Sequence, residues 1–428
     1  MLGLLTIYFF SMKRFFLSFL FIFISYIAHS HAYKTEIRSE QIRTLTVYAD
    51  GDWSSVPVIK MGSENFVEIS FDELSHDYKR YAYRVVHCNA DWTRSDMNVL
   101  EYMEGFSEND MEDGRLSEST LTPYTHYTLS LPNDQVKLTL SGNYAVEIYE
   151  KDRADIVLLT ACFSLSEEKV QIEGSVTATT DVDNKQSHQQ LAFSVNAQSI
   201  NVMQPLCELK VKVRQNHRTD NEVQNVQPLT VQSGLLKYEH NKDLIFEAGN
   251  EYRRFEMTTF KYPGIGINQI SFFKPFYNVE LLPAEKRLNG YLFDKDQNGR
   301  FLIRSQEALD NATGADYFLV HFSLPMETPI LDGGIYLNGD LTNNNLDANG
   351  KMIYNFERKA YEKSLLLKQG AFNYQYLYRP VKSIKSTPLR IEGSYWETEN
   401  EYQIYVYYRP SGERYDRLVG FKQIQTAF

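Results

Sequence analysis

The stretch YRVVHCNADWTRSDMN (83–98) joins an alternating run to a cluster of polar residues. Together with the preceding YKRYA (78–82), the run has the period of two and the aromatic and β-branched content that predict a half-buried strand. Successive side chains of a strand point to opposite faces. Cys88 is therefore expected on one face of this strand, and the other face should carry Tyr81, Tyr83, Val85 and His87.

The same stretch contains four residues of the types that bind metal ions or act in catalysis: His87, Cys88, Asp91 and Asp96. Adjacent strand residues cannot share one metal ion without distortion, and the sequence has no CxxC, HxxxH or HExxH spacing. We therefore predict a strand end and a turn rather than a reactive site, with Trp92 plugging the end of a sandwich. The side chains expected to bond the turn backbone are Asn89, Asp91 and Asp96.

Similar alternating runs, bounded by turn residues, recur along the chain without a clear helical pattern between them. The 30 Tyr and 26 Phe among 428 residues also suit strands. We predict an all-β protein of tandem immunoglobulin-like or early-set β-sandwich domains that follow a cleaved signal peptide. The expected units are a signal peptide (1–32), an N-terminal sandwich (33–165), a middle sandwich (166–310) and a C-terminal early-set-like sandwich (311–428).

The N-terminal segment has the layout of an export signal. Lys13 and Arg14 precede the apolar run FFLSFLFIFISYIA (15–28), and Ser30 and Ala32 give the small-x-small pattern before a cleavage site. The run is shorter than the roughly 20 apolar residues of a membrane-spanning helix. We expect cleavage before Tyr33 and export of the mature chain, with translation starting at either Met1 or Met12.

Charge and cysteine content narrow the functional classes. The formal net charge of −11 argues against binding to nucleic acid or broad adhesion to anionic lipid, which both require a surplus of Lys and Arg. The three cysteines, Cys88, Cys162 and Cys207, do not form a disulfide framework. A Cys88–Cys162 bridge and buried free thiols are equally compatible with the sequence.

The segment DKDQNG (294–299) has a weak likeness to a calcium loop. Asp294, Asp296 and Asn298 match the first, third and fifth loop positions, but Ser305 stands where a bidentate Glu is needed. The flanks read as strands, so we predict a hairpin turn centred on Asn298-Gly299. Calcium remains a minority alternative, and we expect no metal site and no cofactor.

Two other functional classes have candidate residues. Residues 334–378 resemble the starch- and glycogen-binding early-set sandwiches attached to amylase-type enzymes. Sugar stacking would require aromatic rings on one solvent face, and the candidates are Tyr354, Tyr361, Tyr374, Tyr376 and Trp396. For a hydrolase, the sequence has no GxSxG, and only unplaced acidic pairs such as Glu397 and Glu399.

Several stretches in combination resemble the type IX secretion system plug proteins of Bacteroidota. The resemblance extends over residues 33–428 and rests on YRVVHCNADW (83–92), YTLSLPN (127–133), SGNYAVEIYE (141–150), NEYRRFEM (250–257), LNGDLTNN (337–344) and IEGSYWETENEYQIYVYYRP (391–410).

The resemblance implies a periplasmic protein at the inner face of the outer membrane. Such a plug binds the large translocon β-barrel of the type IX system and seals it when no cargo is in transit. The barrel would be its partner and its only route of contact with the membrane. No catalytic residue, cofactor or small-molecule substrate is implied, and the contact residues are not given. The alternative function is an exported carbohydrate-binding protein that uses the C-terminal sandwich.

Overall fold

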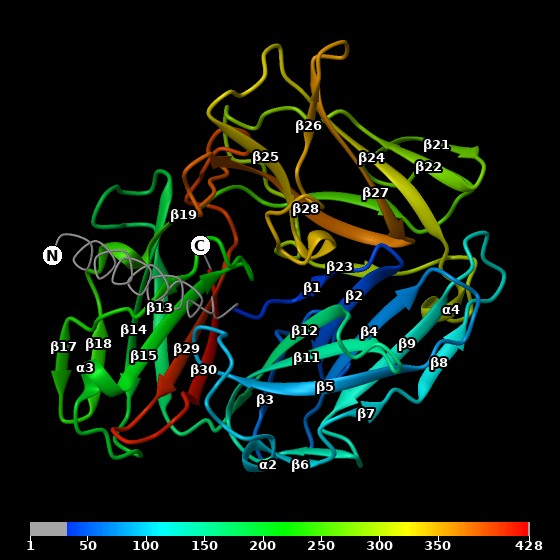
Figure 1. The fold of residues 1–428 in the computed structure, drawn as a ribbon. Helices are drawn as coiled ribbons and strands as arrows, with labels where there is room; N and C mark the ends of the chain where they lie inside the picture. Colours follow the sequence, from blue (N-terminus) through cyan, green and yellow to red (C-terminus); the bar gives the residue numbers. More distant parts are fainter. Residues whose placement is uncertain (1–31, 427–428) are drawn as a thin grey trace, which may run out of the picture.

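The computed structural model describes residues 32–426, and nearly all of its regular elements are strands (Figure 1). The strands form three sandwiches, each made of two main sheets that enclose an apolar core. The predicted all-β class is therefore confirmed. The predicted signal peptide (1–32) lies outside the described residues, apart from Ala32. No helix within residues 32–426 has the length and apolar character needed to cross a membrane.

The first sandwich is drawn in blue, cyan and blue-green in Figure 1. One sheet has the order β1 (Glu36–Ile37), β12 (Val157–Ser166), β11 (Gly142–Glu150), β5 (Tyr81–Cys88) and β7 (Asn109–Asp110), with β3 (Val58–Lys60) parallel to β12. The facing sheet has the order β2 (Ile42–Ala49), β4 (Val67–Glu73), β9 (Thr125–Leu131) and β8 (Asp113–Leu116). A short helix, α2 (Val99–Tyr102), leads into β6 (Met103–Gly105), which pairs with β10 (Val136–Leu138).

The second sandwich combines two distant parts of the chain. One sheet has the order β13 (Gln171–Thr177), β14 (His188–Asn196), β18 (Leu235–Tyr238) and β17 (Thr230–Gln232), and β19 (Ile245–Glu247) also pairs with β14. The other has the order β16 (Val223–Gln224), β15 (Leu209–Gln215), β29 (Glu401–Tyr408) and β30 (Arg417–Gln425). Figure 1 shows the last two strands, in red, beside the green β15. Short helices are α3 (Pro205–Glu208) and η1 (Lys242–Leu244).

The third sandwich lies at the top of Figure 1. In one sheet β28 (Gly370–Pro380) pairs with β20 (Arg253–Met257), β23 (Phe301–Ile303) and β25 (Gly333–Asn338). The other sheet has the order β21 (Ile267–Phe273), β22 (Phe276–Leu281), β24 (Tyr317–Pro325), β27 (Ala360–Lys368) and β26 (Ile353–Asn355). Two short helical turns, α4 (Asn311–Gly314) and η2 (Asp340–Thr342), complete it.

The third sandwich is an insertion in the second, so the sheets do not follow the predicted division at residue 310. All its strands lie between Arg253 and Pro380. In contrast, β29 and β30, expected in the C-terminal sandwich, belong to a sheet of the second: β29 pairs with β15, and β30 pairs with β29. The two crossing points of the chain are adjacent, because Asn400 Nδ2 donates a hydrogen bond to the carbonyl of Ala248 at 2.8 Å. An insertion can enter and leave a domain at one place when the flanking residues meet in this way.

This nesting predicts which fragment folds. A fragment of residues 166–310 lacks β29 and β30 and leaves one side of the β15 sheet without its partner strands, so it should bind a hydrophobic dye and lack cooperative unfolding. A fragment in which three glycines replace residues 250–398 keeps every strand of the first two sandwiches and should unfold cooperatively. Circular dichroism with thermal denaturation distinguishes them, and cooperative unfolding of the first fragment would contradict the nested arrangement.

Candidate functional site

The strand end at His87 and Cys88 is a buried structural position. The predicted faces are confirmed: Tyr81, Tyr83 and Val85 belong to the main core of the first sandwich, whereas Cys88 packs with Cys162 on the opposite face of the sheet. Burial raises the pKa of the Cys88 thiol to about 12, and both thiols are free. Such a thiol is protonated at neutral pH and is a poor nucleophile.

His87 is held as a neutral side chain. Its Nδ1 lies 2.8 Å from Ser95 Oγ and its Nε2 lies 3.1 Å from the carbonyl of Ser141. Burial lowers the pKa of His87 to about 4, although the Ser141 carbonyl opposes this shift. The ring also meets Tyr415 of the second sandwich, with centroids 5.3 Å apart. The imidazole therefore fills the contact between two sandwiches.

The turn after this strand is a docking point for the second sandwich, a role that no pattern in the sequence indicates. The backbone N–H of Ala90 donates to Asp416 Oδ2 at 3.0 Å, and Arg409 Nη2 donates to Asn89 Oδ1 at 2.9 Å. Asp416 also accepts a hydrogen bond from Lys210 Nζ at 2.8 Å. Asp416 is buried and Ala90 packs into an apolar cluster with second-sandwich residues, so this junction, the first–second junction, excludes water.

The predicted roles of the turn residues are only partly correct. Asp91 Oδ1 accepts the backbone N–H of Thr93 at 3.0 Å, as expected. Asp96 is exposed, and its backbone carbonyl rather than its side chain bonds Arg414, at 3.2 Å. Trp92 is half-buried with a left-handed φ of 65°, and it packs beside the two cysteines instead of plugging the main core.

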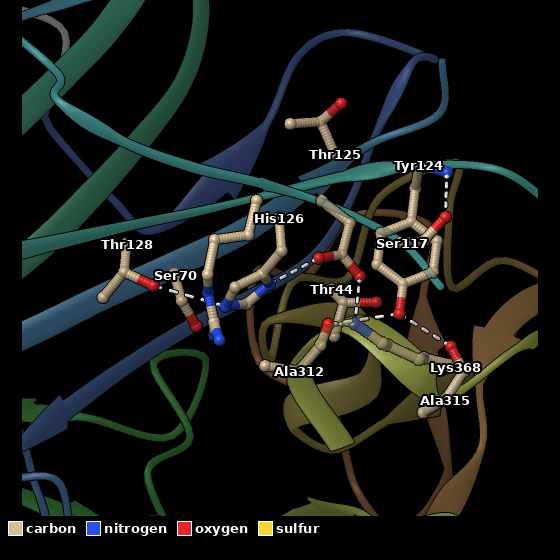
Figure 2. Close-up of polar contacts among 12 residues, drawn as sticks. Thr44, Ser70, Ser117, Tyr124, Thr125, His126, Thr128, Ala312, Ala315 and Lys368 are labelled. Carbon is tan, nitrogen blue, oxygen red and sulfur yellow. Dashed lines mark hydrogen bonds and ion pairs between the residues drawn. The ribbon is translucent and has the colours of Figure 1, made fainter. Parts of the chain in front are cut away.

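A group of four residues, the Asp72 cluster, joins the first and third sandwiches, and all but the half-buried His126 are buried. Asp72 of β4 and His126 of β9 are cross-strand partners, and Tyr317 and Lys368 come from β24 and β27 of the third sandwich. One carboxylate accepts three hydrogen bonds of 2.6 Å, from His126 Nδ1, Tyr317 Oη and Lys368 Nζ. Figure 2 shows His126 and Lys368 on two sides of these contacts.

The surroundings complete the hydrogen bonding of Lys368. Its Nζ donates to the carbonyl of Ala312 at 2.7 Å and lies 4.2 Å from the ring centroid of Tyr124, which belongs to the first sandwich (Figure 2). Tyr124 Oη in turn donates to the carbonyl of Ala315 at 2.8 Å. Cation–π contact and charge-assisted hydrogen bonds both gain strength where water is excluded. The ammonium group of Lys368 therefore has three favourable contacts: the carboxylate of Asp72, the carbonyl of Ala312 and the ring of Tyr124.

The opposite charges of Asp72 and Lys368 determine their protonation states. Burial by itself raises the pKa of Asp72, but the positive charge of Lys368 and the hydrogen bond from His126 outweigh it, so the net pKa is lowered. Burial lowers the pKa of Lys368, and Asp72 opposes that shift. The side chains of both residues are only 1% exposed. Loss of either partner would leave the other as an unpaired buried charge, which is strongly destabilising.

The second and third sandwiches meet at another buried carboxylate. Glu401 of β29 lies 2.7 Å from His217 Nε2 of the second sandwich and 2.7 Å from Arg300 Nη2 of the third. Burial opposes ionisation of Glu401, but His217 and Arg300 outweigh it and lower its pKa to about 2. The Arg300 and Glu401 side chains are almost fully buried. This second–third junction therefore has the same chemistry as the Asp72 cluster.

The candidate calcium residues do not converge. Asp294 pairs with Arg254 at 3.4 Å, while both Asp296 oxygens accept backbone N–H groups, from Tyr252 and Asn298. Burial raises the pKa of Asp296 to about 7. Within residues 32–426 no group of three or more His, Cys, Asp or Glu side chains is placed to hold a metal ion. The predicted hairpin is wrong, because β23 after Asn298-Gly299 pairs with β28 and no strand occupies 282–298.

The aromatic residues proposed for sugar stacking do not form an exposed face. Tyr361, Tyr374 and Tyr376 are at most 5% exposed and belong to the core of the third sandwich. Tyr354 is half-buried against that core and donates its hydroxyl to the carbonyl of Met326. Trp396 is half-buried beside Lys185. The carbohydrate-binding alternative therefore loses the platform on which it depended.

Comparisons with known proteins agree with this architecture. A family model described as "Type 9 secretion system plug protein 1st domain" matches residues 42–167, which contain every strand of the first sandwich except β1. A crystal structure of a hypothetical protein from Parabacteroides merdae ATCC 43184 has a TM-score of 0.91 and 48% sequence identity, covering 92% of this chain and 100% of that one. Dimeric latent PorU from Porphyromonas gingivalis aligns at 10% identity over 90% of this chain and 34% of that one, with a TM-score of 0.14. No curated protein matches.

The Asp72 cluster predicts an asymmetric response to mutation. Lys368→Met should lower the free energy of unfolding by about 3–5 kcal/mol, because Asp72 would keep a buried charge without its ammonium partner. Adding Asp72→Asn to Lys368→Met should recover part of this loss. Lys359→Met, which breaks the exposed Lys359–Glu327 pair, should leave the denaturation midpoint unchanged. Equal effects of the two lysine substitutions in chemical denaturation would contradict a structural role for the cluster.

The second–third junction predicts a pH dependence. The pKa of Glu401 is depressed in the folded protein, from 4.5 to about 2, so its stabilisation is present above pH 4.5 and is lost as the pH falls towards 2. The loss should be on the order of 3 kcal/mol, since one pKa unit corresponds to about 1.4 kcal/mol. Denaturant titrations of the wild type between these pH values should show a steeper decline than those of Glu401→Gln. Glu173→Gln, at an exposed position of β13, should follow the wild type, and an unchanged slope for Glu401→Gln would refute the assignment.

Proposed function

Because the chain belongs to the family of type IX secretion system plug proteins, we propose that it binds the translocon β-barrel of that system and seals it from the periplasmic side when no cargo is in transit. The family assignment establishes a role related to type IX secretion. The proposal adds the barrel as the partner, the periplasm at the inner face of the outer membrane as the location, and closure of the pore as the activity. This role requires binding and no catalysis.

The observation that carries the proposal, together with the family, is the closed arrangement of junctions. The first–second junction, the Asp72 cluster and the second–third junction connect every pair among the three sandwiches. A linear string of domains can bend at each linker, and relative motion is the usual expectation for small interfaces. Three bodies joined pairwise by buried polar contacts cannot hinge about one linker. Such a body supports the proposal, because a plug must hold its shape against a wide pore.

The first test is the identity of the partner. Affinity isolation of a tagged copy from detergent-solubilised envelopes should recover a large outer-membrane β-barrel, identified by mass spectrometry. An unrelated exported β-sandwich protein with the same tag serves as the control. Recovery of no barrel, together with retention of the protein on starch or glycan resin, would overturn the proposal in favour of carbohydrate binding.

The second test is the seal. Deletion of the gene should make the outer membrane more permeable to large antibiotics, and a wild-type copy should restore the barrier. A copy with Lys368→Met should restore it less well than Lys359→Met, because only the former loosens the closed arrangement. Antibiotic susceptibility at matched protein levels measures the difference. Unchanged susceptibility in the deletion strain would remove the sealing role.

A further inference from the structure

The strand β21 is an edge strand without the usual protection. Its seven residues, INQISFF, pair only with β22 within the described part of the chain. Four other edge strands of five or more residues there contain charged residues; they are β2 with Arg43, β13 with Glu173, β20 with Arg253, Arg254 and Glu256, and β30 with Arg417 and Lys422. A fifth, β25, is uncharged, but residues 350–352 cover its outer side: Leu337 N–H donates to the carbonyl of Gly350 at 2.8 Å and Met352 N–H to the carbonyl of Ile335 at 2.9 Å. Charges on an edge deter pairing with another chain, and an uncharged, apolar edge invites it.

The sheet face beside this edge is also open. Phe272 of β21 and Phe260 both contact Tyr277 of β22, with ring centroids 5.1 Å and 5.3 Å apart, and Tyr277 lies 5.2 Å from the core residue Phe318. Phe272 is nevertheless 50% exposed and Phe260 40% exposed. The apolar core of the third sandwich therefore continues to the surface at this end of the sheet. The neighbouring Phe273, on the other face, is 67% exposed.

The unpaired edge of β21 and the exposed aromatic face beside it together favour one kind of binding partner, an extended peptide segment. An added strand would pair with the free backbone of β21 and place alternate side chains over Phe272, so that one segment satisfies both the edge and the open face. A lipid surface would cover the aromatic rings but leave the backbone edge without strand pairing. Residues 257–279 contain Lys261 and Lys274 but no Asp or Glu, in a chain with a net charge of −11. A neutral or acidic segment therefore matches the local charge.

We propose that β21 accepts an added β-strand from a partner protein. The partner segment is extended, neutral or acidic, and carries apolar side chains at alternate positions that cover Phe272 and Phe260. This inference is independent of the identity of the translocon barrel and concerns only the surface that receives the partner.

The test is a register measurement in living cells with the full-length protein. Gln269, Ser271 and Phe273, which alternate along one face of β21, are each replaced by p-benzoylphenylalanine, and illumination is followed by mapping of the cross-linked peptides. Strand addition predicts one partner segment, with the cross-linked site moving by two residues for each two-residue step along β21. The same probe at Lys422, on the charged edge strand β30, is the matched control.

A substitution then distinguishes strand pairing at β21 from non-specific cross-linking of exposed residues. Phe272→Lys places a charge on the open face and should reduce cross-linking at Ser271 at least tenfold with an unchanged melting temperature. Phe273→Lys, on the other face, should reduce it much less. Lipid adducts would point to a membrane surface, and cross-links to a second copy would point to self-association. Lipid adducts or cross-links to a second copy would each overturn the proposal. It would also be overturned if the cross-linked sites did not shift in two-residue steps, or if the cross-linking yield at β21 equalled that at Lys422.

Discussion

The carboxylate of Asp72 is the contact on which the assembly of this protein most depends. It is buried, and it accepts hydrogen bonds from a histidine of its own sheet and from a tyrosine and a lysine of another sandwich. A charge placed there is tolerated only because Lys368 is placed with it. The pair thus ties the position of the third sandwich to the first: any displacement would separate two charges in a medium of low dielectric constant, which costs far more than the same separation in water.

Buried carboxylates also lie where the other sandwiches meet: Asp416 accepts the backbone N–H of Ala90 across the first–second junction, and Glu401 pairs with Arg300 across the second–third junction. Polar junctions of this kind favour one relative arrangement, because hydrogen bonds and ion pairs are lost when the contact shifts, whereas apolar surfaces can slide. The insertion adds to this constraint, since two chain segments, near Ala248 and Asn400, connect the third sandwich to the second. The result is a body with defined outer surfaces. Among the long edge strands of the described residues, β21 is uncharged and pairs only with β22, whereas the outer side of the uncharged β25 is bonded by residues 350–352.

Local sequence patterns were sufficient for the strands but not for their partners. The alternation in residues 81–88 correctly assigned Tyr83 to the core face and Cys88 to the opposite face, because side-chain direction in a strand depends only on neighbouring residues. The pairing of β29 with β15 joins residues almost two hundred positions apart, and neither strand carries a local signal for the other. The predicted boundary at residue 310 failed for this reason. The hairpin at Asn298-Gly299 failed similarly: the turn formed, but the chain continued to a different sheet.

The sequence by itself determined that the chain is all-β and which side chains of the strand at residues 81–88 face the core. The tertiary structure alone decided what covers the strand faces that point away from the core of their own sandwich. Asp72 and His126 occupy polar positions that alternate with core residues, and such positions read as solvent-facing in any single strand. Asp72 is nevertheless buried, because a lysine from nearly three hundred residues further along the chain supplies the compensating charge. Periodicity records the direction of a side chain, and only the packing of distant elements determines whether water or another sandwich lies in that direction.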